Sequence, residues 1–263
     1  MQLIILAAGL GKRLAPYTND RPKCLVELNG KPLIEYQIQA AHQVGIKNIV
    51  VVAGYFADKL AYLDADIVIN KKYKTTNMVQ SLFTARNHFS DQFIVSYGDI
   101  IYSPQVLKNV LESDDEFGVV IDKGWKKYWE RRFTNILSDA ESLRINSSGQ
   151  IYDIGRRVKN IAHVEGQYIG ISIFKNNVVR HMLDLFNSID PYNMTGKEYG
   201  LTKEEFDNLY MTDFIQLMIN SGNLPKAIQI NEAWLEFDSI HDVELGLELI
   251  ALGRLSKSKK FLE

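Results

Sequence analysis

The feature that most constrains this chain is its opening stretch, where an apolar run ends in small residues and is followed by basic ones. The run Leu3 to Leu6 is typical of a buried strand. The small residues and glycines of Ala7 to Gly11 then let backbone N–H groups approach an anion closely. Arg13 adds a planar cationic fork and Lys23 a mobile point charge. We therefore expect a phosphate group to bind at the end of the first strand.

The composition and net charge of the chain limit the classes of binding partner that can be expected. The 263 residues are 46% hydrophobic and 24% charged, as in an ordinary globular protein. The formal net charge of −2 indicates neither nucleic acid nor a membrane surface as a partner, and the basic tail Lys257 to Lys260 is typical of a solvated terminus. The single cysteine, Cys24, excludes an internal disulfide framework and favours a reducing compartment. With no spanning apolar stretch and no basic leader, the sequence predicts a cytoplasmic protein.

Strand-like and helix-like segments alternate along the first half of the chain. This alternation predicts a Rossmann-like α/β fold with a mixed, mainly parallel sheet flanked by helices. Ligands of such sheets bind at the carboxyl ends of strands, so the first strand and Asp99 should face one crevice. The expected strands are 3–6, 48–53, 66–69 and 92–96, and the expected helices are 32–44, 56–63 and 78–89.

The second half of the chain has a different pattern of predicted strands and turns. Short strands with turn signals between them predict a mixed or antiparallel extension, covered by a charged, aromatic loop over 123–139. We expect one domain over 1–263, with a nucleotide-binding half at 1–116 and a small acceptor-binding β/loop portion and closing helix within 117–263. The expected strands are 117–121, 141–145, 150–154, 167–174 and 227–230, and the expected helices are 177–188, 203–220 and 242–255.

The glycine pattern is neither a dinucleotide-binding fingerprint nor a P-loop, because the third glycine and the Gly-Lys-Ser/Thr are missing. Ala-Ala-Gly-x-Gly-x-Arg-Leu, continued by Pro-Lys and Gly-Lys-Pro, resembles instead the signature of nucleotidyltransferases that couple a nucleoside triphosphate to a phosphorylated small molecule. The resemblance implies their fold, which is similar to that of GT-A glycosyltransferases. The alternative is a structural glycine turn with surface basic residues.

The resemblance also implies roles for single residues. Arg13 matches the arginine that grips the β- and γ-phosphates, and Lys23 matches the lysine beside the α-phosphate. Preplaced cations at these points stabilise the charge that develops in the transition state. The residues that match the segment around the base, ribose and phosphates are Leu6, Ala7, Ala8, Gly9 and Gly11.

Two aspartates match the metal ligands of the family. Asp99 follows a strand and a glycine, and Asp238 lies near the end of the fold. Mg²⁺ prefers oxygen ligands, usually one or two carboxylates with phosphate oxygens and water, so we expect Mg²⁺ as the cofactor. The alternative is that each aspartate only caps a helix or strand. Gly-Asp in place of Asp-x-Asp argues against a sugar-nucleotide glycosyltransferase, and the five histidines lack ligand spacing.

The segment from Tyr73 to Leu82 resembles the Asn-x-x-x-Ser segment of the phosphocholine cytidylyltransferase branch. Asn77 and Ser81 lie four residues apart, so both can face a base from the start of one helix. Asn77 is equally well suited to be an N-cap, and the two roles can coexist. By resemblance this segment favours CTP over UTP or dTTP.

Residues 122–132, 135–141 and 165–170 form the predicted acceptor region. They resemble cytidylyltransferases that activate small phosphorylated amino or amide compounds, including phosphoglutamine-type enzymes of capsule pathways. The aromatic side chains of this region could clamp a cationic or planar acceptor through their faces. The alternative is an aromatic anchor that pins a long loop to the sheet. The candidate acceptor residues are Trp125, Tyr128, Trp129, Arg156, Glu165 and Tyr168.

The sequence thus predicts transfer of CMP from CTP to phosphocholine, phosphoglutamine or a similar compound, with release of pyrophosphate. The resemblance places this step in surface-polysaccharide biosynthesis. Two alternatives stay open: a hexose-1-phosphate uridylyl- or thymidylyltransferase, and a non-catalytic nucleotide-binding regulatory subunit. The sequence also leaves a homo-oligomer open.

Overall fold

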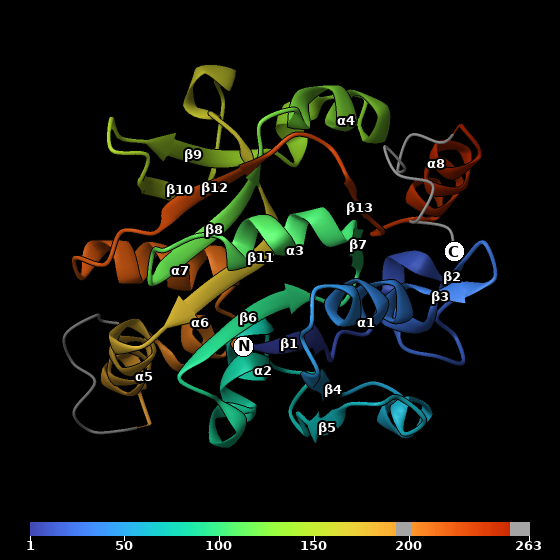
Figure 1. The fold of residues 1–263 in the computed structure, drawn as a ribbon, viewed down its shortest axis with the longest axis horizontal. Helices are drawn as coiled ribbons and strands as arrows, with labels where there is room; N and C mark the ends of the chain where they lie inside the picture. The colour runs from blue at the N-terminus through green and yellow to red at the C-terminus, as the bar shows by residue number, and fades with distance from the viewer. Residues whose placement is uncertain (193–200, 253–263) are drawn as a thin grey trace.

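The computed structural model describes residues 1–192 and 201–252, and its centre is a seven-stranded sheet (Figure 1). The strand order is β12-β8-β11-β6-β1-β4-β5, and only β11 pairs antiparallel with both of its neighbours. This confirms the predicted mixed, mainly parallel sheet, and strands from both halves of the chain share it. The strands are β1 Gln2–Ala7, β4 Asn48–Ala53, β5 Asp66–Ile69, β6 Gln92–Tyr97, β8 Phe117–Asp122, β11 Gln167–Lys175 and β12 Lys226–Ile230.

Helices pack on both faces of this sheet. Strand β1 explains the continuous apolar run, because Leu3 and Ile5 join one buried cluster while Ile4 and Leu6 join the other. The first cluster includes side chains of α1 Leu33–Gln43, α3 Pro104–Leu111 and α4 Trp125–Arg132. The second includes side chains of α2 Met78–Thr84, α5 Asn177–Ile189, α6 Lys203–Asp207 and α7 Met211–Asn220.

Several of the predicted elements differ from the structure. The helix expected over 56–63 is only the short 3-10 helix Ala57–Leu60, which begins after Phe56 in the left-handed region with φ 47°. The helix expected over 203–220 is two helices, because Tyr210 adopts an extended conformation and forms a capping box with Asp213. The loop expected over 123–139 contains α4, and α3 was not predicted.

Three two-stranded pairs complete the described chain. The most consequential for the site is β7 Ile100–Tyr102 with β13 Trp234–Glu236, which pair antiparallel. The final helix, α8 Ile240–Ala251, follows directly after this pair, and the tail lysines lie outside the described residues. The other two pairs are β2 Glu27–Leu28 with β3 Lys31–Pro32, and β9 Glu141–Ile145 with β10 Ile151–Arg157.

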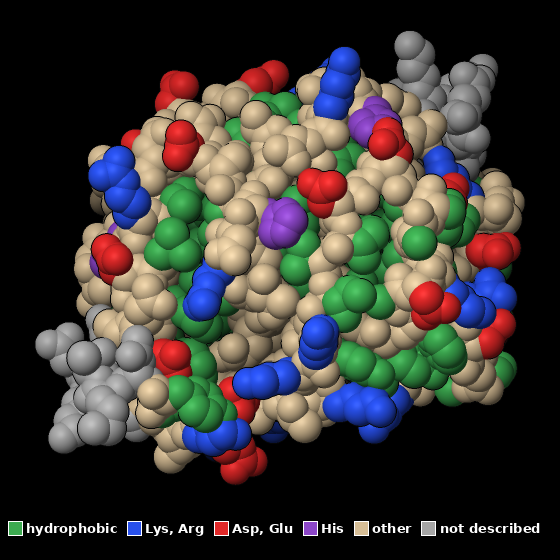
Figure 2. Space-filling model, turned by 90° about the horizontal axis from the view of Figure 1, so that it is seen from below, with side chains coloured by type: hydrophobic (Ala, Val, Ile, Leu, Met, Phe, Trp, Pro, Cys, Tyr) green, Lys and Arg blue, Asp and Glu red, His purple; other side chains and the backbone are tan. Residues whose placement is uncertain are grey.

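The surface carries charges of both signs. On the face drawn in Figure 2, Lys and Arg side chains lie among Asp and Glu side chains. Within residues 1–192 and 201–252, no helix combines the length and the apolar character needed to cross a bilayer.

Candidate active site

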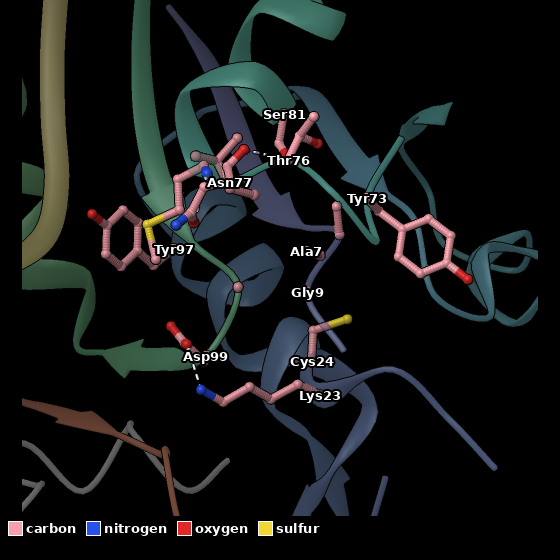
Figure 3. Close-up of a pocket in the computed structure, with 14 residues that line it drawn as sticks. Ala7, Gly9, Lys23, Cys24, Tyr73, Thr76, Asn77, Ser81, Tyr97 and Asp99 are labelled. Atoms are coloured by element: carbon pink, nitrogen blue, oxygen red, sulfur yellow. Dashed lines mark hydrogen bonds and ion pairs between the residues drawn. The ribbon is translucent and has the colours of Figure 1, made fainter. Parts of the chain in front are cut away.

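A pocket opens where β1 and β6 end, at the carboxyl edge of the sheet (Figure 3). This is the edge at which the sequence predicted a ligand. Most of the predicted nucleotide-binding residues lie around it, together with residues that the sequence had not singled out. The lining residues are Leu6, Ala7, Ala8, Gly9, Lys23, Cys24, Tyr73, Thr76, Asn77, Met78, Ser81, Tyr97, Gly98 and Asp99.

Two glycines shape this pocket in different ways. A side chain at Gly9 would meet no atom within 4 Å, so the backbone of the turn borders open space that a ligand can enter. A Cβ at Gly98 would lie 2.8 Å from the carbonyl oxygen of Leu6, which is closer than packing permits. The Gly98 N–H donates to that same oxygen at 2.9 Å, so Gly98 holds the turn that leads to Asp99 tightly against β1.

Lys23 lies between the two predicted metal ligands. Its Nζ is 2.6 Å from Asp99 Oδ2 and 2.5 Å from Asp238 Oδ1. Arg13 Nη2 reaches the same Asp238 oxygen at 3.1 Å, while 71% of the Arg13 side chain stays exposed. The structure therefore brings these four predicted residues together at one end of the pocket.

The pairing of β7 with β13 explains why Asp99 and Asp238 meet. Asp99 immediately precedes Ile100, the first residue of β7. Ile100 pairs with Glu236, and Asp238 lies two residues after Glu236. The backbone N–H of Phe237 donates to the Asp99 carbonyl at 3.0 Å, which extends this pairing to the aspartates themselves.

The charges at this end of the pocket stabilise one another. Burial by itself disfavours the charged form of Lys23, but Asp99 and Asp238 outweigh it and hold the pKa of Lys23 above its ordinary value. For Asp238, burial acts in the opposite direction from Lys23 and Arg13, and the two cations keep the pKa of this carboxyl below its ordinary value. Lys23 and Asp238 are therefore both charged at neutral pH.

Arg132, which the sequence analysis did not single out, supports this cluster from behind. Its side chain is 1% exposed, forms an ion pair with Glu236, and donates from Nε to Asp242 Oδ1 at 2.8 Å. Asp242 Oδ2 in turn accepts from the backbone N–H groups of Asp238 at 3.0 Å and Ser239 at 2.8 Å. Arg132 therefore fixes Asp242, and Asp242 fixes the backbone that carries Asp238.

One atom of the cluster has the character of a metal ligand. Within the described part of the chain, Asp99 Oδ1 is buried and has no hydrogen-bond partner. A carboxylate oxygen in this state fits a cation that also takes phosphate and water oxygens. The described residues contain no cluster of three or more His, Cys, Asp or Glu side chains that could hold a metal without such additional ligands.

At the other end of the pocket, the side chains of Asn77 and Ser81 differ in their hydrogen bonds to the rest of the protein. The Asn77 side chain caps α2 by accepting from the Met78 N–H at 2.9 Å, and it donates to the Asn208 carbonyl at 3.3 Å. The Asn77 amide is therefore engaged in the fold, as the N-cap alternative predicted. Ser81 lines the pocket, and buried Asn70, which the sequence analysis missed, donates to its hydroxyl at 3.0 Å.

The proposed aromatic clamp requires a correction. Trp125 and Trp129 are 4% and 3% exposed and pack into the buried cluster with Trp234, so their faces cannot receive an acceptor. The alternative, an aromatic anchor, describes them. Tyr128 has a related structural role, because its hydroxyl accepts from the Glu236 N–H at 3.0 Å and so holds β13.

The other three predicted acceptor residues do not line the pocket. Arg156 pairs with Asp153 at 3.2 Å, and Glu165 pairs with Arg144 at 3.1 Å, both on the β9–β10 side of the fold. Tyr168 lies behind the pocket wall, with its ring edge-to-face against Tyr97 at 5.6 Å. The spacing of these residues in the sequence contains no information about the tertiary contacts that hold their side chains away from the pocket.

A buried carboxyl in the second half gives a pH-dependent prediction. Burial, with Asp213 and Asp139 nearby, raises the pKa of Glu141 from an ordinary 4.5 to about 7. A raised carboxyl pKa means that the folded state loses stability as pH rises from about 4.5 through 7. Glu141→Gln should therefore be more stable than the unmodified protein at pH 8, by up to about 3 kcal/mol, and gain little at pH 5.

Thermal unfolding at both pH values measures this difference. Glu244→Gln, on the exposed face of α8, controls for the loss of a surface carboxylate. An equal change in Tm at pH 5 and pH 8 for Glu141→Gln would contradict the assignment.

The arrangement of the fold and the charged cluster is the one that the opening motif implied, and it defines a nucleotidyltransferase. The model of one protein family, described as the MobA-like NTP transferase domain, matches residues 3–142. CTP:phosphoglutamine cytidylyltransferase from Campylobacter jejuni is 37% identical over 259 residues, which cover 94% of this chain and 100% of that protein. The chain therefore belongs to the family of MobA-like NTP transferases.

Two further comparisons agree with this assignment. Choline-phosphate cytidylyltransferase from Streptococcus pneumoniae is 27% identical, over 82% of this chain and 94% of that protein. The solved structure of CTP:phosphocholine cytidylyltransferase from Streptococcus pneumoniae matches with a TM-score of 0.71 and 24% identity, over 95% of this chain and 98% of that chain. This likeness supports the fold over nearly the whole chain.

Proposed function

We propose that this protein transfers CMP from CTP to a small phosphorylated acceptor and releases pyrophosphate. One observation carries the proposal: Lys23 lies within 2.6 Å of both Asp99 and Asp238, in the same pocket as the glycine turn after β1. A cation there faces the place where negative charge develops on an α-phosphoryl group. CTP, phosphoglutamine and choline phosphate occur in the names of the relatives, which supports the choice of nucleotide and acceptor class.

The residues of the chain would contribute to this reaction through positioning and charge. The acceptor phosphate is already ionised, so its oxygen attacks the α-phosphorus in line without a dedicated general base. Lys23 would stabilise the charge at the α-phosphate, and Arg13, whose side chain is largely exposed although it pairs with Asp238, would reach the departing pyrophosphate. Cys24 lines the pocket, but burial raises the pKa of its thiol to about 12, so it stays protonated and is not a nucleophile.

We also propose Mg²⁺ as the cofactor. Asp99 and Asp238 would hold it together with phosphate oxygens and water, and the unpartnered Asp99 Oδ1 supports this role. When bound, Mg²⁺ would neutralise part of the charge on the reacting phosphates.

Pyrophosphate release from a matrix of nucleotides and acceptors tests the proposal. CTP, UTP and dTTP are each combined with phosphocholine, a phosphoglutamine-type compound and hexose 1-phosphates, with Mg²⁺ or with a chelator. We expect release only with CTP, a phosphoamino or phosphoamide acceptor, and Mg²⁺. Release from UTP or dTTP with a hexose 1-phosphate would support the uridylyl- or thymidylyltransferase instead, and CTP binding without release would support the regulatory subunit.

Three predictions concern the setting of the reaction. A role in capsular or other surface-polysaccharide biosynthesis, a location in the cytoplasm and a homo-oligomeric state all rest on the sequence resemblance and composition. They remain predictions.

A further inference from the structure

A chain of hydrogen bonds runs beside the end of the pocket that is far from Lys23. Asn70, directly after β5, is 3% exposed, and its Nδ2 donates to Ser81 Oγ and to Thr76 Oγ1, both at 3.0 Å. Ser81 Oγ donates in turn to the Asn77 carbonyl at 3.3 Å. Ser81 and Thr76 both line the pocket, as Figure 3 shows.

The orientation of the Asn70 amide follows from its other contact. The backbone N–H of Lys72 donates to Asn70 Oδ1 at 2.9 Å, so this atom must be the carbonyl oxygen. The remaining amide atom is the NH₂ group, which can only donate, and its two hydrogens point to Thr76 and Ser81. Ser81 therefore has to accept from Asn70.

This directionality determines what Ser81 can offer to a ligand. A serine hydroxyl has one proton and two lone pairs. The proton is directed to the Asn77 carbonyl and one lone pair accepts from Asn70, which leaves one lone pair for the pocket. A ligand group that faces Ser81 is therefore favoured if it carries an N–H donor. A ligand carbonyl in the same place would be disfavoured, because it would face a lone pair of the Ser81 oxygen.

We propose that Asn70 is a specificity-determining residue: by holding Ser81 as a hydrogen-bond acceptor, it selects a pyrimidine nucleotide with an exocyclic amine over one with a carbonyl. Cytosine has this amine, whereas uracil and thymine have an oxygen in its place. The inference rests on the proposed function and deepens it. A site built to bind an N–H group rejects an analogue that lacks it, because polar groups are then left unpaired.

The ratio of kcat/KM for CTP to that for UTP measures this selection. Asn70→Ala removes the donor that fixes the orientation of the Ser81 hydroxyl, so this hydroxyl can rotate and donate to a carbonyl, and the ratio should fall about tenfold. Ser81→Ala removes the acceptor itself, so the ratio should fall to a similar extent, through CTP more than UTP. Asn70→Asp should keep the ratio, because its carboxylate accepts the Ser81 proton and leaves lone pairs facing the pocket.

Two controls make the experiment decisive. Thr84→Ala removes another hydroxyl of α2, one that donates to the Gln80 carbonyl at 2.8 Å and does not line this pocket, and it should leave the ratio unchanged. Thermal unfolding checks that each variant is folded. An unchanged ratio in Asn70→Ala would overturn the inference, as would an equal fall in Asn70→Asp and Asn70→Ala.

Failure of the proposed function remains distinguishable from failure of this inference. If the unmodified protein releases no pyrophosphate from any nucleotide, the proposed function fails. Calorimetric binding of CTP and UTP to the same variants then tests the selection, with the same expected order of the Kd ratios. An Asn70→Ala variant that keeps the Kd ratio of the unmodified protein would contradict the inference.

Discussion

Lys23→Ala should lower kcat for pyrophosphate release by about 10²- to 10³-fold while the fold persists. Lys23 lies within 2.6 Å of both aspartates, and its side chain is 15% exposed. Its removal takes away the positive charge that would stabilise the α-phosphoryl group in the transition state. Because this charge acts more on the transition state than on bound CTP, we expect kcat to fall far more than the affinity for CTP.

Steady-state kinetics and a CTP-binding titration separate these two effects. Lys47→Ala, an exposed lysine before β4, controls for the loss of a surface charge. Near-normal turnover in Lys23→Ala would remove Lys23 from the catalytic group, and an unfolded variant would show instead that its pairing with Asp99 and Asp238 is mainly structural.

The second large effect concerns stability. Arg132→Met should lower the free energy of unfolding by about 3–5 kcal/mol, because it leaves Glu236 and Asp242 buried without their cation. Burial already raises the pKa of Glu236, against the influence of Arg132, which shows how unfavourable an unpaired carboxylate is there. Urea unfolding at pH 7 measures the loss.

A double-mutant cycle tests whether the ion pairs are the cause. Adding Asp242→Asn to Arg132→Met removes one of the stranded charges, so the double variant should be less destabilised than the sum of the two single variants. The catalytic readout is separate: if Arg132 also positions Asp238, folded Arg132→Lys should lose kcat with little change in KM for CTP. Strict additivity in the cycle would rule out coupling between Arg132 and Asp242.

The nucleotide half of the site could be predicted because its signals are local. Small residues and glycines after a buried strand specify a close backbone approach; Gly9 borders open space in the pocket, and Gly98 lies where a Cβ would meet the Leu6 carbonyl oxygen. The fold class follows from the alternation of strands and helices, and the seven-stranded sheet confirms it. Asp99 could be placed beside the turn after β1 because β1 and β6 end at the same edge of the sheet, whereas Lys23 was assigned through the family resemblance.

The remainder depends on contacts that no local pattern encodes. Trp125 and Trp129 resemble an aromatic clamp in the sequence, but in α4 they face the core, and the helix itself was not predicted. Arg132 belongs to a run of charged residues that is usually a solvated surface, and only the tertiary fold shows its buried partners. No sequence pattern singled out Asn70, because its proposed role is to donate a hydrogen bond to Ser81, and this contact is visible only in the tertiary structure.

The short pair β7–β13 has a consequence for the order of events during synthesis. Asp99 is made early, but its partner Asp238 reaches it only when β13 pairs with β7 near the end of the described chain. A nascent chain that has completed the glycine turn after β1, Lys23 and Asp99 thus still lacks Asp238, the second carboxylate beside Lys23. Nucleotide turnover should therefore begin only after β13 has been made and has paired with β7, so that chains still lacking β13 consume no triphosphate.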